Sequence, residues 1–458
     1  MLMDKIKKVI HQVKSSSFLK SVLSLSSGVV IGQMINTLGM PIIGRLYSAS
    51  DMGDYTLIAS RSNLVMSVAV LGMLTVFMLP KEDEESKELC RLVSLSSLII
   101  TSIGAITLLL LSPCWKLFQV EKVSYNRALL IMWCYVVISS INNICYAYCN
   151  RHKLFKVLFW TPVIGASVNI GLGVLFGIFD WGFVGYTIAH ITSLVVNIVF
   201  LIIHANPFSK IPKDQRKGYL VLLKEYQRFP KYQMPANLVH NLGYQIPIEI
   251  MGFFFSSAVL GYYSMTDRVM YLPITLLATP INRVYYQEAV QRYQKGEDIA
   301  EFGFKIMETN IKIAIIPISI LMIFGKWIFS LVLGSQWEQS GVYSSVLGVY
   351  FLMAFCASCL SGSFVIIGKN SWNLVFSIVN VMIGVFLYAI VKIFPNISVL
   401  SFLFIMALLF TIERVFEEGL FFVHLGLQLK RYVLFIIKFI FIPFFLAFGI
   451  QMFINKLI

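Results

Sequence analysis

Two arginines, Arg61 and Arg268, stand inside long apolar stretches of the chain. A charge near the centre of a bilayer costs on the order of 3 kcal/mol on insertion scales, so it usually faces a cavity or a partner. The planar guanidinium fork bonds two oxygens of a phosphate or pyrophosphate at once. The two residues therefore predict an anion-binding cavity. The alternative for each is that it snorkels to a membrane surface or pairs locally.

Both arginines follow a repeated segment. Residues 42–55 (IIGRLYSASDMGDY) align with residues 249–263 (EIMGFFFSSAVLGYY). The register places Gly44 on Gly252, Ser48 on Ser256, Gly53 on Gly261 and Tyr55 on Tyr263. It brings Arg61 within one residue of Arg268, although one residue rotates a helical side chain by about 100°. A repeat of this length predicts two similar halves, with the two guanidiniums at similar depth facing one cavity.

Three acidic residues are candidates for binding a coupling ion, H⁺ or Na⁺. Glu249 follows Pro247, whose missing N–H leaves a backbone carbonyl free beside the carboxylate. The alternative for Glu249 is a static pair with a neighbouring arginine. Asp267 adjoins Arg268 but points about 100° away on a helix. The third candidate is Glu413.

Glu413 belongs to a charged cluster with Arg414, Glu417 and Glu418. Arg414 and Glu418 have the i,i+4 spacing that lets two side chains pair on one helix face. We expect this pairing, at the cytoplasmic end of the helix; the alternative is that the cluster lies in the core.

Uncharged polar residues gather on two apolar runs that the repeat makes equivalent. They are Gln33 and Asn36 on the first run and His240, Asn241, Tyr244 and Gln245 on the second. Amides and aromatic faces bind sugars, and the alternative is hydrogen bonding between helices. Their concentration favours a polar lumen. Arg45 ends the first run, where it would anchor the outer turn or meet a substrate on its way out.

Thirteen apolar runs must position these residues. The chain has 458 residues, of which 58% are hydrophobic and 13% charged, too apolar for a soluble domain. Each run can cross about 30 Å of hydrocarbon. Lipid offers no hydrogen-bond partners to the backbone groups at an open sheet edge, so all of the runs should be helices. The runs are 18–43, 55–79, 92–111, 128–149, 157–178, 184–204, 234–255, 258–281, 306–333, 342–367, 373–394, 399–423 and 432–456. We therefore predict an all-α polytopic membrane protein of about 12–14 transmembrane helices.

The net charge of +14 follows from topology rather than from nucleic-acid binding. With the N-terminus in the cytoplasm, the inner segments are rich in lysine and arginine, as the positive-inside rule requires. Their basic residues are Lys5, Lys7, Lys8, Lys14, Lys20, Arg151, Lys153, Lys156, Lys210, Lys213, Arg216, Lys217, Lys224, Arg228 and Lys231. The outer loops hold little beyond Lys116, Lys122 and Arg127.

This topology predicts five parts. A cytoplasmic segment (1–17) precedes an N-terminal lobe of six helices (18–204). A basic cytoplasmic linker (205–233) leads to a C-terminal lobe of six helices (234–423). Residues 424–458 form an extra helix, or a short hairpin split at Pro443.

Several chemistries are excluded. The paired cysteines Cys145/Cys149 and Cys356/Cys359 lie in apolar runs without a nearby histidine, which is typical of buried hydrophobic residues rather than of a metal site. No phosphate-binding loop, nucleophile elbow or HExxH motif occurs, so we expect neither an enzyme nor a cofactor. The basic N-terminus is followed by an apolar run too long for a signal peptide.

Three segments resemble polysaccharide biosynthesis flippases, the O-antigen and capsule transporters. They are FLKSVLSLSSGVVIGQMINTLGMPIIGRLYSASDMGDYTL (18–57), LGYYSMTDRVMYLPITLLATPINRVYYQEAVQRYQKG (260–296) and FGKWIFSLVLGSQWEQSGVYSSVLGVYFL (324–352). That family belongs to the multidrug/oligosaccharidyl-lipid/polysaccharide exporter superfamily. The resemblance implies a fold like that of the MATE transporters, with two pseudo-symmetric six-helix lobes around a central cationic cavity.

The resemblance also implies a function. A bacterial inner-membrane flippase would move an oligosaccharide linked to undecaprenyl pyrophosphate from the inner to the outer leaflet by alternating access. Ion coupling and contact with the polysaccharide polymerase or chain-length machinery would follow. The alternatives are a drug or toxin antiporter, which needs an acid-rich cavity, and a lipid II flippase. A membrane glycosyltransferase would need a larger extramembrane face, and a purely structural scaffold would not need charges at mid-depth.

Overall fold

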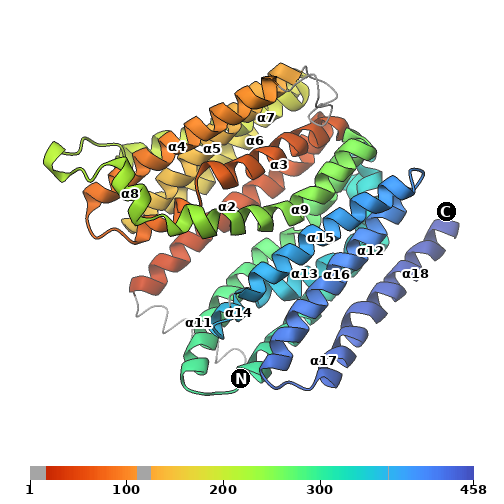
Figure 1. Ribbon diagram of the computed structural model, residues 1–458. Coiled ribbons are helices and arrows are strands. Elements are labelled where there is room, and N and C mark those ends of the chain that lie inside the picture. Colours follow the sequence, from red (N-terminus) through yellow and green to blue (C-terminus); the bar gives the residue numbers. More distant parts are fainter. Residues whose placement is uncertain (1–16, 111–124, 370, 458) are drawn as a thin grey trace. The chain divides into compact units, whose positions relative to one another are not determined.

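The computed structural model describes residues 17–110, 125–369 and 371–457, and these ranges are helical almost throughout (Figure 1). They contain no strand, which confirms the predicted all-α fold. Every predicted apolar run falls on one or more helices. Lys116, Lys122 and nearly all of the predicted N-terminal segment lie outside the described residues.

The helices divide into two compact units. The N-terminal lobe contains the described residues up to Leu46 and those from Arg61 to Leu238. The C-terminal lobe contains Tyr47–Ser60 and the described residues from Val239 onward. The division therefore falls within two helices, α3 and α9, and the predicted linker 205–233 packs with the N-terminal lobe.

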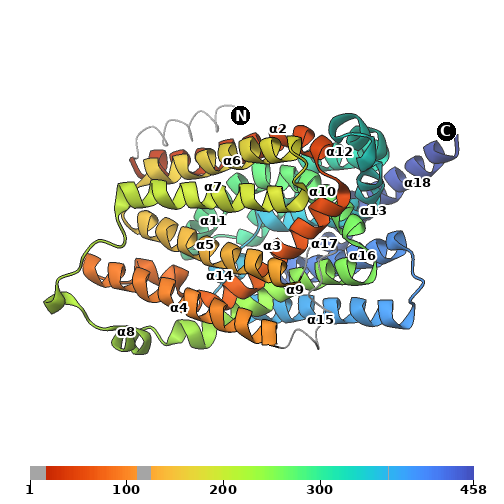
Figure 2. The same cartoon turned by 90° about the horizontal axis from the view of Figure 1, so that it is seen from above.

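In the N-terminal lobe, α6 lies between α2 and α7 and packs along both of them, while α5 packs on α4 and α7 (Figure 2). A short apolar core beneath α4 and α5 includes Phe77, Leu89 and Tyr148. The helices of this lobe are α2 (Ser17–Leu46), the second part of α3 (Ala49–Ala69), α4 (Asp83–Leu110), α5 (Tyr125–Arg151), α6 (Phe155–Ile178), α7 (Gly182–Ala205), α8 (Tyr219–Glu225) and the start of α9 (Met234–Phe254).

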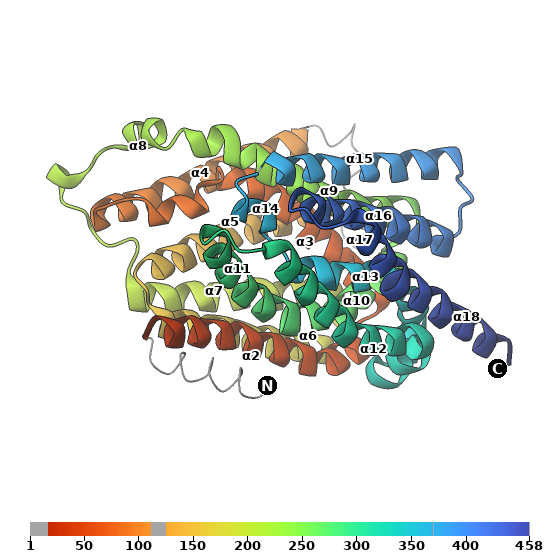
Figure 3. The ribbon, with the colours of Figure 1, turned by 90° about the horizontal axis from the view of Figure 1, so that it is seen from below.

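In the C-terminal lobe, the buried helix α13 packs against α10, α12 and α16, and α15 lies beside α16 (Figure 3). One continuous hydrophobic core runs through the lobe. Besides the rest of α9, its helices are α10 (Ser257–Met270), α11 (Thr279–Gln294), α12 (Ile299–Leu333), α13 (Glu338–Cys359), α14 (Ser363–Ile366), α15 (Ser371–Ile393), α16 (Val399–His424), α17 (Leu429–Ile436) and α18 (Ile442–Leu457).

The C-terminal run is a continuous helix and not a hairpin. A π turn over Ile437–Phe441 joins α17 to α18, and Figure 1 shows the two as one rod. The wider turn immediately before Pro443 lets the helix accommodate a residue that has no N–H to donate. Of the two alternatives for residues 424–458, the structure adopts the extra helix.

The two repeat copies start their helices in the same way. The backbone N–H of Asp51 donates to the Ser48 hydroxyl at 3.2 Å, and that of Val259 donates to the Ser256 hydroxyl at 3.2 Å. Each serine thus caps the first turn of α3 or α10. The cap starts α3 at Ala49, earlier than the predicted position 55, because the polar residues before Tyr55 belong to the helix.

The glycines of the repeat form a helix crossing inside the C-terminal lobe. A Cβ at Gly53 would lie 1.7 Å from the Ser257 carbonyl oxygen, and one at Gly261 would lie 1.7 Å from the Ala49 carbonyl oxygen. The Ser257 hydroxyl donates to Asp54 at 2.5 Å beside this crossing. Only glycine permits this approach of α3 and α10, which explains why both copies carry it.

We predict that Gly261→Ala separates α3 from α10 and destabilises the protein by about 3 kcal/mol or more, because the new methyl group meets backbone and not a flexible side chain. The thermal midpoint and folding yield of the purified protein in detergent measure this. Gly171→Ala is the control, since a Cβ there meets nothing within 4 Å. Equal midpoints for the two variants would contradict the crossing.

The linker is fastened to the first turns of α4. The backbone N–H groups of Lys217 and Gly218 donate to the two oxygens of the buried Glu88, each at 2.9 Å. The Tyr226 hydroxyl and Lys217 Nζ bind Glu85 at 2.8 and 3.0 Å. Burial lowers the pKa of Lys217, but hydrogen bonds to Glu85 and Glu225 outweigh it, so the pKa lies above its usual value. Lys217 therefore stays charged at neutral pH.

Ten of the described helical segments are long and apolar enough to span a membrane. The helices α3, α9 and α10 are not among them: α10 is too short, and α3 and α9 are too polar. These three helices carry Arg61, Glu249 and Arg268. The polar residues that predict a site are thus the ones that lower the hydropathy of their own helices.

Candidate functional site: a polar cavity in the C-terminal lobe

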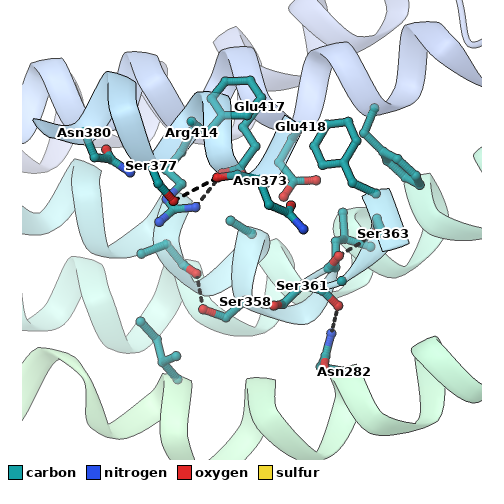
Figure 4. Close-up of a pocket in the computed structure, with 18 of the residues that line it drawn as sticks. Asn282, Ser358, Ser361, Ser363, Asn373, Ser377, Asn380, Arg414, Glu417 and Glu418 are labelled. Carbon is teal, nitrogen blue, oxygen red and sulfur yellow. Dashed lines mark hydrogen bonds and ion pairs between the residues drawn. The ribbon is translucent and has the colours of Figure 1, made fainter. Parts of the chain in front are cut away.

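A cavity of about 650 Å³ lies within the C-terminal lobe (Figure 4). Its wall combines one arginine, two glutamates, several neutral polar side chains and aromatic rings. The residues come from α9 and α10 through α11, from α13 and α14, and from α15 and α16. They include His240, Tyr244, Tyr271, Thr275, Thr279, Asn282, Tyr350, Ser358, Ser361, Ser363, Phe364, Asn373, Phe376, Ser377, Asn380, Arg414, Glu417 and Glu418.

Arg414 is the charged centre of this wall. Its guanidinium pairs with Glu417 and donates a hydrogen bond to the Tyr244 hydroxyl. The arginine thus bonds to its i,i+3 neighbour, and the expected i,i+4 pairing with Glu418 is wrong. Both spacings bring side chains together on a helix. Here one guanidinium nitrogen donates to the Tyr244 hydroxyl on α9.

Two carboxylates of the charged cluster are buried in the lobe. The Glu413 side chain is 1% exposed, and Glu418 is also buried. The Glu413 carboxylate lies 3.5 Å from Arg414 Nε, but within the described chain neither of its oxygens accepts a hydrogen bond. The amide oxygen of Asn380, a residue 4% exposed on α15, also lacks a donor in the described chain. Buried acceptors without donors are costly, so they suit a proton, a cation or an ordered water.

Three polar residues of α15 form one face of the cavity. Asn373, Ser377 and Asn380 are spaced i, i+4 and i+7, and the Ser377 hydroxyl donates to the Asn373 carbonyl at 2.8 Å. Figure 4 shows them opposite Ser358, at the end of α13, and Ser361, in the turn that follows. Our sequence analysis missed them. Their helical spacing inside an otherwise apolar run was the available signal.

Of the predicted polar residues, His240 and Tyr244 line this cavity. Glu413 is not in the cavity wall, but it lies beside Arg414, which is. Gln245 instead accepts a hydrogen bond from Ser60 of α3. Asn241, Glu249 and Asp267 are half-buried and do not line the cavity. The structure therefore separates the three acidic candidates, with Glu413 alone beside Arg414.

Arg268 lies elsewhere in the C-terminal lobe. Its guanidinium carbon sits 5.5 Å from the ring centroid of Tyr55, a cation–π contact between α10 and α3. Tyr55 is a residue of the repeat and follows Gly53 by two positions on α3. Arg268 is not in the wall of the cavity around Arg414.

The other predicted residues belong to the N-terminal lobe. Arg61 is 5% exposed on α3, Gln33 and Asn36 are half-buried on α2, and Arg45 is exposed in the last turn of α2. The convergence of Arg61 and Arg268 on one cavity stays a prediction.

Within the described residues, no group of three or more histidine, cysteine, aspartate or glutamate side chains is arranged to hold a metal ion. The cysteines at 145, 149, 356 and 359 are buried and unbonded.

Comparison with known proteins defines the class. No curated protein sequence matches the chain. The structure of the lipid II flippase MurJ in an inward closed conformation aligns with a TM-score of 0.66 at 12% identity, covering 96% of this chain and 99% of that one. An inward-facing MATE multidrug resistance transporter of the MOP superfamily aligns with a TM-score of 0.55 at 16% identity, covering 90% and 95%. A MOP superfamily transporter from Pyrococcus furiosus aligns with a TM-score of 0.53 at 18% identity, covering 90% and 96%.

The chain thus shares the fold of these transporters, and its ten apolar segments long enough to span a membrane make it a multi-pass membrane protein. The profile of the family described as "Polysaccharide biosynthesis protein" matches residues 42–342. The chain belongs to this family of membrane flippases.

Proposed function

We propose that the protein moves an oligosaccharide linked to undecaprenyl pyrophosphate from the inner to the outer leaflet by alternating access. The family match supports a role in polysaccharide biosynthesis. The observation that carries the proposal is the cavity of the C-terminal lobe, because neutral polar groups and aromatic rings dominate its wall. Amide and hydroxyl groups bind sugar hydroxyls, and aromatic faces cover the apolar faces of sugar rings.

We assign the glycan and the pyrophosphate of the substrate to different places in the protein, because the charges at those places differ. The cavity wall holds one arginine, already paired with Glu417, and a second carboxylate, Glu418. A pyrophosphate would be repelled there, so the cavity suits the glycan. Arg268 and Arg61 are the groups that we assign to the pyrophosphate, with Gln33, Asn36 and Asn241 along the path of the glycan. The polyprenyl tail stays in lipid.

Ion coupling is assigned to Glu413. A carboxylate that is buried, flanked by an arginine and lacking hydrogen-bond donors favours uptake of H⁺ or Na⁺. The Asn380 amide oxygen supplies a neighbouring acceptor for either ion. Glu249 and Asp267 are the second-choice coupling residues, because both side chains are only half-buried.

Reconstituted vesicles test the proposal. A fluorescent lipid-linked oligosaccharide is incorporated in both leaflets, and a membrane-impermeant quencher reports its movement. We expect flipping of the pyrophosphate-linked oligosaccharide. The second candidate is lipid II, favoured by the likeness to the lipid II flippase fold. Flipping of lipid II alone would select that alternative, and ion-driven export of cationic drugs would select the antiporter.

The orientation has its own test. We propose an inner-membrane protein with a cytoplasmic N-terminus, a cytoplasmic linker and external turns at 46–54 and 334–341. Single cysteines at 215 and 338, in a background without other cysteines, are exposed to an impermeant maleimide on intact cells with a permeabilised outer membrane. We expect labelling at 338 only, and labelling at 215 alone would reverse the topology. Contact with the polymerase or chain-length machinery would then occur on the external side.

A further inference from the structure

An open groove of about 520 Å³ lies in the N-terminal lobe, between the beginning of α6 and the end of α7. Its floor is apolar and aromatic, and all of the ionisable side chains in its lining are basic. The lining residues are Lys153, Leu154, Phe155, Lys156, Val157, Trp160, Phe200 and His204. The proposed transport function leaves this groove without a role.

The position of the groove places it at a membrane surface. Helices α6 and α7 are both long and apolar enough to span a membrane, and α6 begins where α7 ends, at Phe155 and Ala205. The groove therefore sits where hydrocarbon gives way to headgroups. Trp160 is 52% exposed there, as expected for an aromatic side chain at that level.

The local backbone fixes the basic rim. Lys153 has a φ of +54°, and this left-handed turn ends α5 and lets α6 begin two residues later. Both Lys153 and Lys156 are exposed, on either side of the first residue of α6. The N-terminus of α6 adds the positive end of a helix dipole to the two ammonium groups. At the other wall, Nδ1 of His204 donates to the Phe200 carbonyl at 2.8 Å, which orients the imidazole.

We propose that this groove binds an anionic glycerophospholipid. The phosphate lies against Lys153 and Lys156, and an acyl chain lies along Trp160, Phe155 and Phe200. Both halves of the ligand are required, because a cationic rim attracts an anionic headgroup and an apolar floor excludes a freely soluble phosphate. The site concerns the lipid surrounding the protein, and it does not depend on what the protein transports.

Quenching of Trp160 tests the proposal on the full-length protein in bilayers. Brominated phosphatidylglycerol and brominated phosphatidylcholine are compared at equal mole fraction, and the Trp160 component is obtained by subtracting the signal of Trp160→Phe. Two lysines near the surface should give phosphatidylglycerol a preference of roughly 30-fold. The preference should weaken in 1 M salt, because exposed charges are screened.

Two double variants distinguish the effect of the lysines in the groove from the effect of the protein's overall charge. Lys153→Gln with Lys156→Gln should reduce the preference to near unity, with no change in backbone strain because glutamine and lysine share the same Cβ. The control, Lys224→Gln with Lys231→Gln, removes two exposed charges outside the groove and should keep the preference. Equal quenching by both lipids in the wild type would overturn the proposal. So would an equal loss in the control, or full displacement of the brominated lipid by water-soluble glycerol phosphate.

Discussion

Glu413→Gln is expected to remove most of the ion-driven transport while the protein stays folded and still binds lipid-linked glycan. Coupling between two ligands usually amounts to about 5–150-fold, so removal of the coupling group should slow gradient-driven flipping by up to about 100-fold. The rate is measured in vesicles with and without a proton or sodium gradient. Glutamine has the shape of a protonated glutamate and cannot alternate between charge states.

The thermal stability of Glu413→Gln should be unchanged or higher, although its transport is impaired. The Glu413 carboxylate is buried without a hydrogen-bond donor in the described chain, so its charge opposes folding. Glu413→Gln should therefore melt at the same or a higher temperature than the wild type. Glu338→Gln is the control, because that side chain is 48% exposed at the start of α13. Normal gradient dependence in Glu413→Gln would make Glu413 structural, and Asp267 would be tested next.

Arg268→Ala is expected to abolish glycan export at normal protein levels. Hydrogen bonds to a charged partner contribute about 1.5–3 kcal/mol each, so losing two of them to a pyrophosphate weakens binding by at least about 100-fold. Arg268→Lys should restore only part of the activity, because a lysine keeps the charge but not the planar fork. Surface glycan and headgroup affinity are the two measurements.

The control for Arg268 is Arg292→Ala. Arg292 also stacks on an aromatic ring, with its guanidinium 4.4 Å from the Phe302 centroid, and it belongs to the same lobe. It pairs with Glu288 at a partly exposed position on α11, so we assign it no substrate. Equal loss in both variants would indicate damage to the lobe. Wild-type export in Arg268→Ala would remove this residue from the mechanism.

The order of the helices and the repeat follow from local properties of the sequence. The length of each apolar run predicts a membrane-spanning segment. The segment must be a helix, because lipid offers no hydrogen-bond partners to the edge of a sheet. The alignment of Ser48 with Ser256 and of Gly53 with Gly261 pointed to equivalent positions, and the structure gives these residues equivalent caps and equivalent contacts. Such features depend on a residue and its nearest neighbours along the chain.

The composition of the cavity depends on distant partners. Helical spacing places Asn373, Ser377 and Asn380 on one face, but it does not say that Arg414 of another helix lies across from them. The same holds for the choice of Glu417 over Glu418, which follows the position of Tyr244.

The sequence by itself determined a polytopic helical membrane protein with two related halves and a set of intramembrane charges, because hydropathy and period are local. Only the tertiary structure decided which charges share a cavity. It buried Glu413 beside Arg414, left Glu249 and Asp267 half-buried, and continued the last helix through Pro443. The physical reason is that packing between helices decides which polar groups are removed from water together. Once removed from water, these groups interact strongly with one another.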